Sequence, residues 1–200
     1  RRSGEPYIFH PIAVATIVAT QMSLDATAIA SALLHDVVED TDVTLEDIER
    51  EYGPTIARII DGLTKISGIS DSNVSVQAEN FRKMLITISN DIRVILIKLA
   101  DRLHNMQTMG AMIRQKQQKI ASETLYIYAP LAHRLGLYNI KTEMEDLSLK
   151  YTEPEAYENI VRLLRESDQA QKAYIARFIA EVKDMLDRED LDYTITGRNK

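Results

Sequence analysis

The 200-residue chain contains no cysteine and no tryptophan, and it has only 7 glycines and 5 prolines. The absence of cysteine excludes a disulfide framework, a thiolate nucleophile and a cysteine-ligated zinc site. No apolar run approaches the roughly 18 residues of a membrane helix, and no positively charged, apolar leader opens the sequence. We therefore expect a cytoplasmic protein without a membrane partner.

The chain also lacks an excess of positive charge. Its formal net charge is −6, with 45% hydrophobic and 27% charged residues, which is typical of a folded globular chain. An acidic chain does not hold nucleic acid by bulk electrostatics, so we expect no direct nucleic-acid binding. A small polyanion can bind only where metal ions or a few local cations reverse this background.

The apolar spacing and the rarity of helix breakers predict an all-α fold. The segment Ile92–Ala100 is β-branched enough for a buried strand, but no breaker follows before Gly110, so we interpret it as a helix. Ser67–Ser75 is the clearest loop, and only Leu191–Thr196 alternates like a strand. In the first part of the chain, helices are expected to begin after His10 and at Asp25, Thr44 and Gly53. Two more are expected from about Ser75 to Ile88 and from Asn90 toward Gly110. The last three are expected over Ile120–Leu135, over Ile140–Leu149 and from Thr152 onward.

The strongest chemical signal is the segment His35-Asp36-Val37-Val38-Glu39-Asp40, which ends the apolar helix capped by Asp25. In a continuous helix, His35 and Glu39 share one face, as do Asp36 and Asp40. Three crowded carboxylates repel one another, and a bound cation relieves that repulsion. The alternative is a solvated helix end whose acids cluster without function.

Two further segments place polar residues beside apolar runs. Asp101 follows the apolar Ile95–Ala100, and Asn105 shares its helical face. His104 lies three residues after Asp101, where it is more easily a supporting or core group than a ligand. We expect Pro11 to keep His10 outside the helix that follows, with its ring turned away from that helix.

Together these segments supply two imidazoles and two carboxylates: His10, His35, Asp36 and Asp101. Such a set suits Mn²⁺, Fe²⁺ or Zn²⁺, and its oxygen share favours Mn²⁺. Four protein ligands leave positions for water and a phosphate oxygen, as metal-assisted hydrolysis requires. Glu39 and Asp40 are then available to orient and deprotonate the water.

Four motifs in the same order closely resemble the RelA/SpoT-type enzymes, which synthesise and hydrolyse guanosine tetra- and pentaphosphate in the stringent response and belong to the HD phosphohydrolase superfamily. They are Arg1–Pro11 (RRSGEPYIFHP), His35–Thr41 (HDVVEDT), Lys98–Met106 (KLADRLHNM) and Tyr128–Gly136 (YAPLAHRLG). The resemblance spans essentially the whole chain. Gly197–Lys200 resembles the first residues of the family's synthetase domain.

The resemblance implies one Mn²⁺ on the four ligands above and a catalytic pair, Glu39 and Asp40. It implies that guanosine and its phosphates are held by Arg1, Arg2, Ser3, Asn105 and Thr108. Gln107 stands where the family usually has arginine, so a cation near the polyanionic substrate is missing. The implied reaction is hydrolysis of the 3′-pyrophosphate, giving GDP or GTP and pyrophosphate.

The expected organisation is an HD-type hydrolase domain over residues 1–115, a helical linker unit over 116–187 and the truncated start of an α/β synthetase domain over 188–200. If the chain is part of a longer protein, the synthetase and regulatory domains of that same protein are the expected partners of the hydrolase domain. Two other functions stay open. One is a different HD nucleotide phosphohydrolase, and the other is a nucleotide-sensing module whose hydrolase is switched off.

Overall fold

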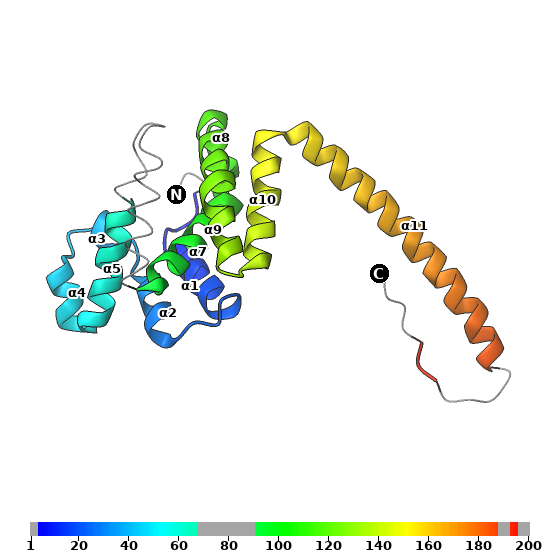
Figure 1. The fold of residues 1–200 in the computed structure, drawn as a ribbon, viewed down its shortest axis with the longest axis horizontal. Helices are drawn as coiled ribbons and strands as arrows, with labels where there is room; N and C mark the ends of the chain where they lie inside the picture. Colours follow the sequence, from blue (N-terminus) through cyan, green and yellow to red (C-terminus); the bar gives the residue numbers. More distant parts are fainter. Residues whose placement is uncertain (1–3, 68–90, 188–192, 196–200) are drawn as a thin grey trace. The chain divides into compact units, whose positions relative to one another are not determined.

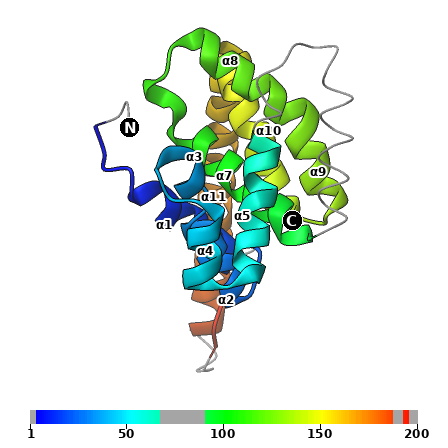
Figure 2. The same ribbon diagram turned by 90° about the vertical axis from the view of Figure 1, so that its left-hand side faces the viewer.

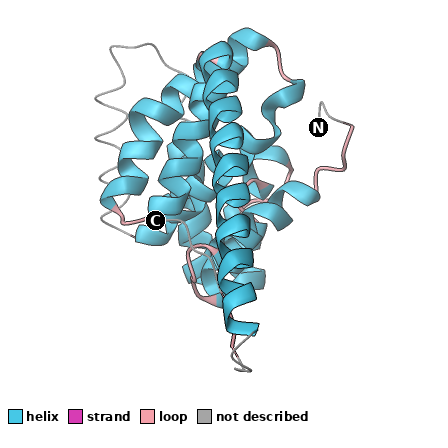
Figure 3. Ribbon diagram, turned by 90° about the vertical axis from the view of Figure 1, so that its right-hand side faces the viewer, coloured by secondary structure: helices cyan, strands magenta, loops and turns pink. Residues whose placement is uncertain are grey.

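The computed structural model describes residues 4–67, 91–187 and 193–195, and every regular element within these ranges is helical (Figure 3). The all-α prediction is confirmed. The chain divides into two compact units, Arg1–Thr152 and Glu153–Lys200. The predicted helix Ser75–Ile88, nearly all of the loop Ser67–Ser75 and half of the predicted strand Leu191–Thr196 lie outside the described residues. Residues 193–195 are irregular.

The first part of the larger unit contains α1 (Phe9–Thr20), α2 (Ala26–Leu33), α3 (Val37–Asp40), α4 (Leu45–Tyr52) and α5 (Pro54–Ser67) (Figure 1). The predicted caps are confirmed at two of these helices. The Asp25 carboxylate accepts a hydrogen bond from the backbone N–H of Ala28 at 2.9 Å. Thr44 and Asp47 form a reciprocal capping box at the start of α4.

The helix that Asp25 caps ends earlier than predicted. It stops at Leu33, a turn follows, and α3 begins at Val37. The cause is the ring of His35, whose Nδ1 lies 2.8 Å from the carbonyl oxygen of Ala32. In a continuous helix that carbonyl would accept the N–H of Asp36. The metal-ligand candidates His35 and Asp36 therefore occupy a break between two helices, not one helical face.

Helix α7 (Ile92–Thr108) is the centre of the larger unit and contacts α1, α2, α5 and α10 (Figure 2). Its helical assignment is confirmed, and its N-cap is Asp91, one residue after the predicted Asn90. Five apolar side chains of α7 are almost fully buried: Val94, Ile95, Ile97, Leu99 and Leu103. Each stabilises the fold by about 1.5–3 kcal/mol through burial. This packing fixes the position of every polar group on α7.

The second part of the larger unit begins with a 3₁₀ turn, η2 (Met109–Ala111), and then α8 (Arg114–Glu123). A single π-helical turn, η3 (Thr124–Tyr128), joins α8 to α9 (Ala129–Arg134), and α10 (Tyr138–Thr152) follows after Gly136. Met106 and Met109 pack with Ala121 in a small second core. Residues 116–152 therefore belong to the same compact unit as residues 1–115, although the functional boundary near residue 115 stays a prediction.

The smaller unit consists mainly of α11 (Pro154–Leu186). Its predicted cap, Thr152, is wrong: Thr152 is the last residue of α10 and donates its hydroxyl to the carbonyl of Ser148 at 2.9 Å. The N-cap position of α11 is Glu153, without a side-chain cap, and Pro154 takes the first helical position. Among the described residues, no helix combines the length and the apolar character needed to cross a lipid bilayer.

Candidate metal centre

Three separate parts of the fold bring the four predicted metal ligands together. His10 comes from the first turn of α1, His35 and Asp36 from the break between α2 and α3, and Asp101 from the middle of α7. His10, His35 and Asp101 are only 2–5% exposed. Ligand atoms of His10, His35 and Asp36 all lie within 4.8 Å of one another. Asp101 Oδ1 adds a fourth group, 3.3 Å from His10 Nε2 and 3.8 Å from His35 Nε2.

His10 is held from behind by a second histidine. Contrary to the prediction, His10 lies inside α1, with its N–H bonded to the Tyr7 carbonyl and Pro11 following it in the first turn. Its Nδ1 lies 2.7 Å from Nδ1 of His104. That contact directs the opposite nitrogen, Nε2, toward the carboxylates of Asp36 and Asp101. His104 is thus a supporting group, as its spacing predicts.

His35 shows the same arrangement with a backbone partner. A carbonyl oxygen only accepts hydrogen bonds, so the contact with Ala32 places the proton of a neutral ring on Nδ1. Nε2 then presents a lone pair to the cluster. It is a buried nitrogen without a hydrogen-bond partner, although Asp36 Oδ2 lies 2.9 Å away. A lone pair that faces carboxylate oxygens is unfavourable unless a cation lies between them.

The two oxygens of Asp101 have different surroundings. Oδ1 faces the histidines and accepts a hydrogen bond from the side chain of Asn105 at 2.6 Å. Oδ2 pairs with the ammonium group of Lys98 at 2.8 Å. Burial would raise the pKa of Asp101, but the charge of Lys98 and the approach of His10 hold it well below its ordinary value. Asp101 is therefore an ionised carboxylate inside the core.

Asp36 forms the more open side of the cluster. Its Oδ2 faces both histidines and accepts a hydrogen bond from the Tyr7 hydroxyl. Burial opposes ionisation of Asp36, yet the approach of His10, His35 and Tyr7 lowers its pKa well below the ordinary value. Burial, Asp36 and Asp40 all raise the pKa of Tyr7, so this hydroxyl remains a donor near neutral pH.

The cluster fits a divalent cation. It presents two imidazole nitrogens, each with its other ring nitrogen held by a partner, as is usual for histidine ligands of metals. It also presents two ionised carboxylates, and the unpartnered Nε2 of His35 points among them. Nitrogen and oxygen donors without thiolate suit Mn²⁺, Fe²⁺ or Zn²⁺.

The predicted catalytic pair lies beside this cluster on α3. Glu39 and Asp40 are exposed, and their backbone N–H groups both bond to the Asp36 carbonyl, at 3.1 and 2.9 Å. Asp40 is close enough to Tyr7 to raise the pKa of its hydroxyl. Both carboxylates are thus accessible to water next to a metal-ligand candidate.

The predicted substrate residues are only partly placed. Arg1, Arg2 and Ser3 lie outside the described residues. Asn105 contacts Asp101, so its observed role is to orient that carboxylate. The Thr108 hydroxyl donates to the carbonyl of His104 at 2.8 Å.

Gln107, at the position where the resembled family usually has arginine, is exposed and donates to Glu143 of α10 at 2.6 Å. An amide at this position adds no positive charge to the surface of α7. Neutralisation of a polyanionic ligand near this point would have to come from other groups.

Two residues of the cluster received no role from the sequence alone. Tyr7 contacts Asp36 and packs its ring 5.7 Å from that of His10. Lys98 lies three residues before Asp101, a helical spacing that signals an ion pair. That spacing was readable in the sequence, whereas the Tyr7 contact depends on where α1 meets α3.

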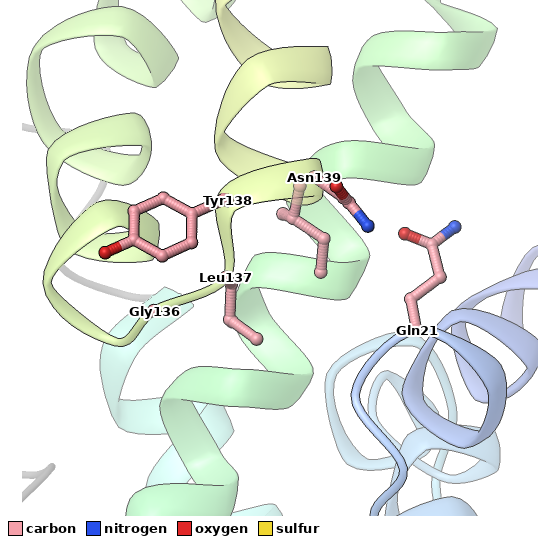
Figure 4. Close-up of a pocket in the computed structure, with 6 residues that line it drawn as sticks. Gln21, Gly136, Leu137, Tyr138 and Asn139 are labelled. Carbon is pink, nitrogen blue, oxygen red and sulfur yellow. The ribbon is translucent and has the colours of Figure 1, made fainter. Parts of the chain in front are cut away.

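A small pocket lies elsewhere in the larger unit (Figure 4). It measures about 190 Å³ and is lined by Gln21 at the end of α1 and by residues 136–140. None of its lining residues belongs to the metal centre. Its carboxamides and open shape define no ligand chemistry.

Helices that converge on two buried histidines, a buried aspartate and the half-buried Asp36 define an all-α domain with a candidate metal site. Residues 1–138 match the sequence model of the HD domain family, named for its histidine and aspartate, and the chain belongs to that family. Over its whole length the chain is also similar to SpoT and to proteins named 3′-pyrophosphohydrolases.

The curated relatives are much longer than this chain. It is 46% identical over 201 residues to a guanosine-3′,5′-bis(diphosphate) 3′-pyrophosphohydrolase of Haemophilus influenzae, and 44% identical to the bifunctional (p)ppGpp synthase/hydrolase SpoT of Escherichia coli. A GTP pyrophosphokinase of Streptomyces coelicolor is 46% identical over 200 residues. The matches cover 100% of this chain but only 30%, 28% and 23% of those proteins.

A solved structure is also similar. It is described as a metazoan ortholog of SpoT that hydrolyses ppGpp, with a TM-score of 0.50 and 26% sequence identity. The likeness covers 72% of this chain and 81% of that one.

Proposed function

We propose that this chain hydrolyses the 3′-pyrophosphate of guanosine tetra- or pentaphosphate, giving GDP or GTP and pyrophosphate. The observation that carries the proposal is the unpartnered Nε2 of His35, which faces two ionised carboxylates and a second histidine. That site needs a divalent cation, and similarity over the whole chain to proteins named 3′-pyrophosphohydrolases supports the substrate. Residues 1–115 form the proposed hydrolase, 116–187 a linker, and 188–200 the start of a synthetase domain in a longer protein.

The proposed cofactor is one Mn²⁺, held by His10, His35, Asp36 and Asp101. When bound, such an ion acts as a Lewis acid toward a phosphate oxygen and lowers the pKa of a coordinated water. His104 and the Ala32 carbonyl keep the two imidazoles oriented from behind. Asn105 does the same for Asp101.

Glu39 and Asp40 carry out the proton transfers in this proposal. The oxygen of the attacking water forms a bond to the phosphorus attached to the ribose 3′-oxygen, and the bond from that phosphorus to the 3′-oxygen breaks. One acidic residue accepts the proton of the water, and the 3′-oxygen leaves as a hydroxyl after it gains a proton. The exposure of both carboxylates supports this role because water and nucleotide reach them directly.

The test is pyrophosphate release from guanosine tetraphosphate, measured with Mn²⁺ and with a chelator. The wild-type chain should release pyrophosphate only with metal, and a Glu39→Gln/Asp40→Asn double variant should lose release by at least 100-fold while it still folds. Release from other nucleotides but not from this one would instead favour a different HD phosphohydrolase. Nucleotide binding without release would favour a sensing module.

A further inference from the structure

One of the four sequence motifs, Tyr128–Gly136, plays no part in the metal centre described above. Its first residue, Tyr128, ends the π-helical turn η3 and is 5% exposed. π-helical turns are rare and occur often at functional sites. This turn contacts α7, the helix that carries Asp101.

Tyr128 holds the side chain of Arg102. The guanidinium carbon of Arg102 lies 4.2 Å from the centroid of the Tyr128 ring, and Nη2 donates to the Tyr128 hydroxyl at 3.1 Å. On the other side, Nη1 lies 3.4 Å from the Glu123 carboxylate. The Arg102 side chain is only 11% exposed, so these partners replace most of its contact with water.

Arg102 directly follows Asp101 and lies one turn after Lys98 on α7. Lys98 is also largely buried, with 13% of its side chain exposed, and it pairs with Asp101 Oδ2. Lys98 is bonded to Asp101, whereas Arg102 is bonded to Tyr128 of η3 and to Glu123 of α8. Adjacent residues of a helix point in different directions, so Arg102 links the turn of α7 that carries Asp101 to η3 and α8.

We propose that Tyr128 is a positioning residue for the metal centre, and the inference rests on the proposed function. By accepting a hydrogen bond from Arg102, Tyr128 fastens to η3 the turn of α7 that carries Asp101. Asp101 then keeps Oδ2 on Lys98 and Oδ1 toward the two histidines. Without the hydroxyl, the buried guanidinium loses an acceptor, and the turn of α7 that carries Asp101 is held less firmly against η3.

The test is isothermal titration of metal-free protein with Mn²⁺ alone. A Tyr128→Phe variant keeps the ring beneath Arg102 and removes only the hydroxyl, and it should bind Mn²⁺ about tenfold more weakly, the size typical of supporting residues around a metal. The matched control is Tyr126→Phe, in the same turn and 76% exposed, which should bind like the wild type. Pyrophosphate release should need correspondingly more Mn²⁺ in Tyr128→Phe.

The variant Thr124→Val distinguishes a purely structural role of η3 from the positioning role of Tyr128. Thr124 is fully buried in η3 and donates to the Ile120 carbonyl at 2.7 Å without touching Arg102. This variant should lower the melting temperature and leave Mn²⁺ affinity unchanged. If Tyr128→Phe does not fold, Glu123→Gln tests the same arginine from its other side and should weaken Mn²⁺ binding severalfold.

Affinity within twofold of the wild type, in Tyr128→Phe or in its substitute, would overturn the positioning role. The positioning role would also be overturned if Thr124→Val weakened Mn²⁺ binding as much as Tyr128→Phe does. A wild-type chain that binds no Mn²⁺ would refute the proposed function itself. The two failures are therefore distinguishable.

Discussion

His35 Nε2 lies 2.9 Å from Asp36 Oδ2 and forms no hydrogen bond with it. The other ring nitrogen, Nδ1, lies 2.8 Å from the Ala32 carbonyl, which can only accept, so Nδ1 carries a proton and Nε2 can present a lone pair to the carboxylate. A cation between Nε2 and the carboxylate satisfies both atoms. The contact between His35 and the Ala32 carbonyl thus lies at the break between α2 and α3, and it directs Nε2 of His35 toward the carboxylates.

Mn²⁺ should stabilise the wild-type fold. At 100 times its dissociation constant, a ligand specific for the folded state adds about 2.7 kcal/mol, or roughly 5–10 °C in melting temperature for a chain of this size. Asp36→Asn should remove most of this shift, measured by thermal unfolding with Mn²⁺ and with chelator. Glu39→Gln/Asp40→Asn should keep it, because these carboxylates are not ligands. An equal shift in Asp36→Asn would argue against the ligand set.

Lys98 and Asp101 should depend strongly on each other. Asp101→Asn leaves a largely buried ammonium without its ion partner, which should cost about 3 kcal/mol in the free energy of unfolding of metal-free protein. Lys98→Met should destabilise similarly. The double variant should be more stable than the sum of the single effects by at least about 1 kcal/mol. Urea unfolding of the wild type, the two single variants and the double variant gives the coupling free energy between Lys98 and Asp101. Strictly additive changes in the free energy of unfolding would contradict a direct ion pair.

The cap of α7 gives a prediction for pH. The Asp91 carboxylate accepts from the Arg93 backbone N–H at 3.0 Å and pairs with its guanidinium at 2.7 Å. The hydrogen bonds from Arg93 lower the pKa of Asp91. A lowered folded-state pKa gives stability that is present above the unfolded value near 3.9 and lost as pH falls through the folded value.

Asp91→Asn keeps a capping oxygen and loses the charge, so it should cost less than about 1 kcal/mol at pH 7. The difference from wild type should shrink as pH falls below about 4, because the Asp91 carboxyl of the unfolded chain then gains a proton that the folded carboxylate resists. Urea unfolding at pH 7 and pH 3 checks this. A difference that grows toward pH 3 would show that the ion pair is not its source.

Tyr7→Phe tests the hydroxyl that contacts Asp36. Loss of this donor should free the Asp36 carboxylate to rotate and weaken Mn²⁺ binding by about tenfold. Burial and the neighbouring carboxylates raise the pKa of Tyr7, so the effect should be constant between pH 6 and 9. Metal titration measures it. Tyr52→Phe, at a residue that is 53% exposed and part of α4, is the control.

Much of the metal centre was predictable from local sequence. The candidate ligand residues follow apolar segments or begin one, and the absence of a helix breaker before Gly110 indicated correctly that Ile92–Ala100 is a helix. The Thr44–Asp47 capping box was also readable because caps depend only on neighbouring residues. Local rules therefore gave the four candidate ligand side chains that the structure brings together.

Long-range contacts decided what local rules could not. The break at His35 results from a ring-to-carbonyl bond that competes with a helical one. The contact of Tyr7 with Asp36 joins residues 29 positions apart, and Tyr128 reaches Arg102 across 26. No periodicity encodes such pairs, because they depend on how α1, α3, η3 and α7 pack.

The most direct test of the account is X-ray diffraction from crystals grown with Mn²⁺, collected at the manganese absorption edge. The account predicts one strong anomalous peak within coordination distance of His10 Nε2, His35 Nε2, Asp36 Oδ2 and Asp101 Oδ1. Crystals of Asp36→Asn, grown in the same way, should show a weaker peak or none. A fully occupied peak elsewhere, with the four side chains in direct contact and no ion among them, would contradict it.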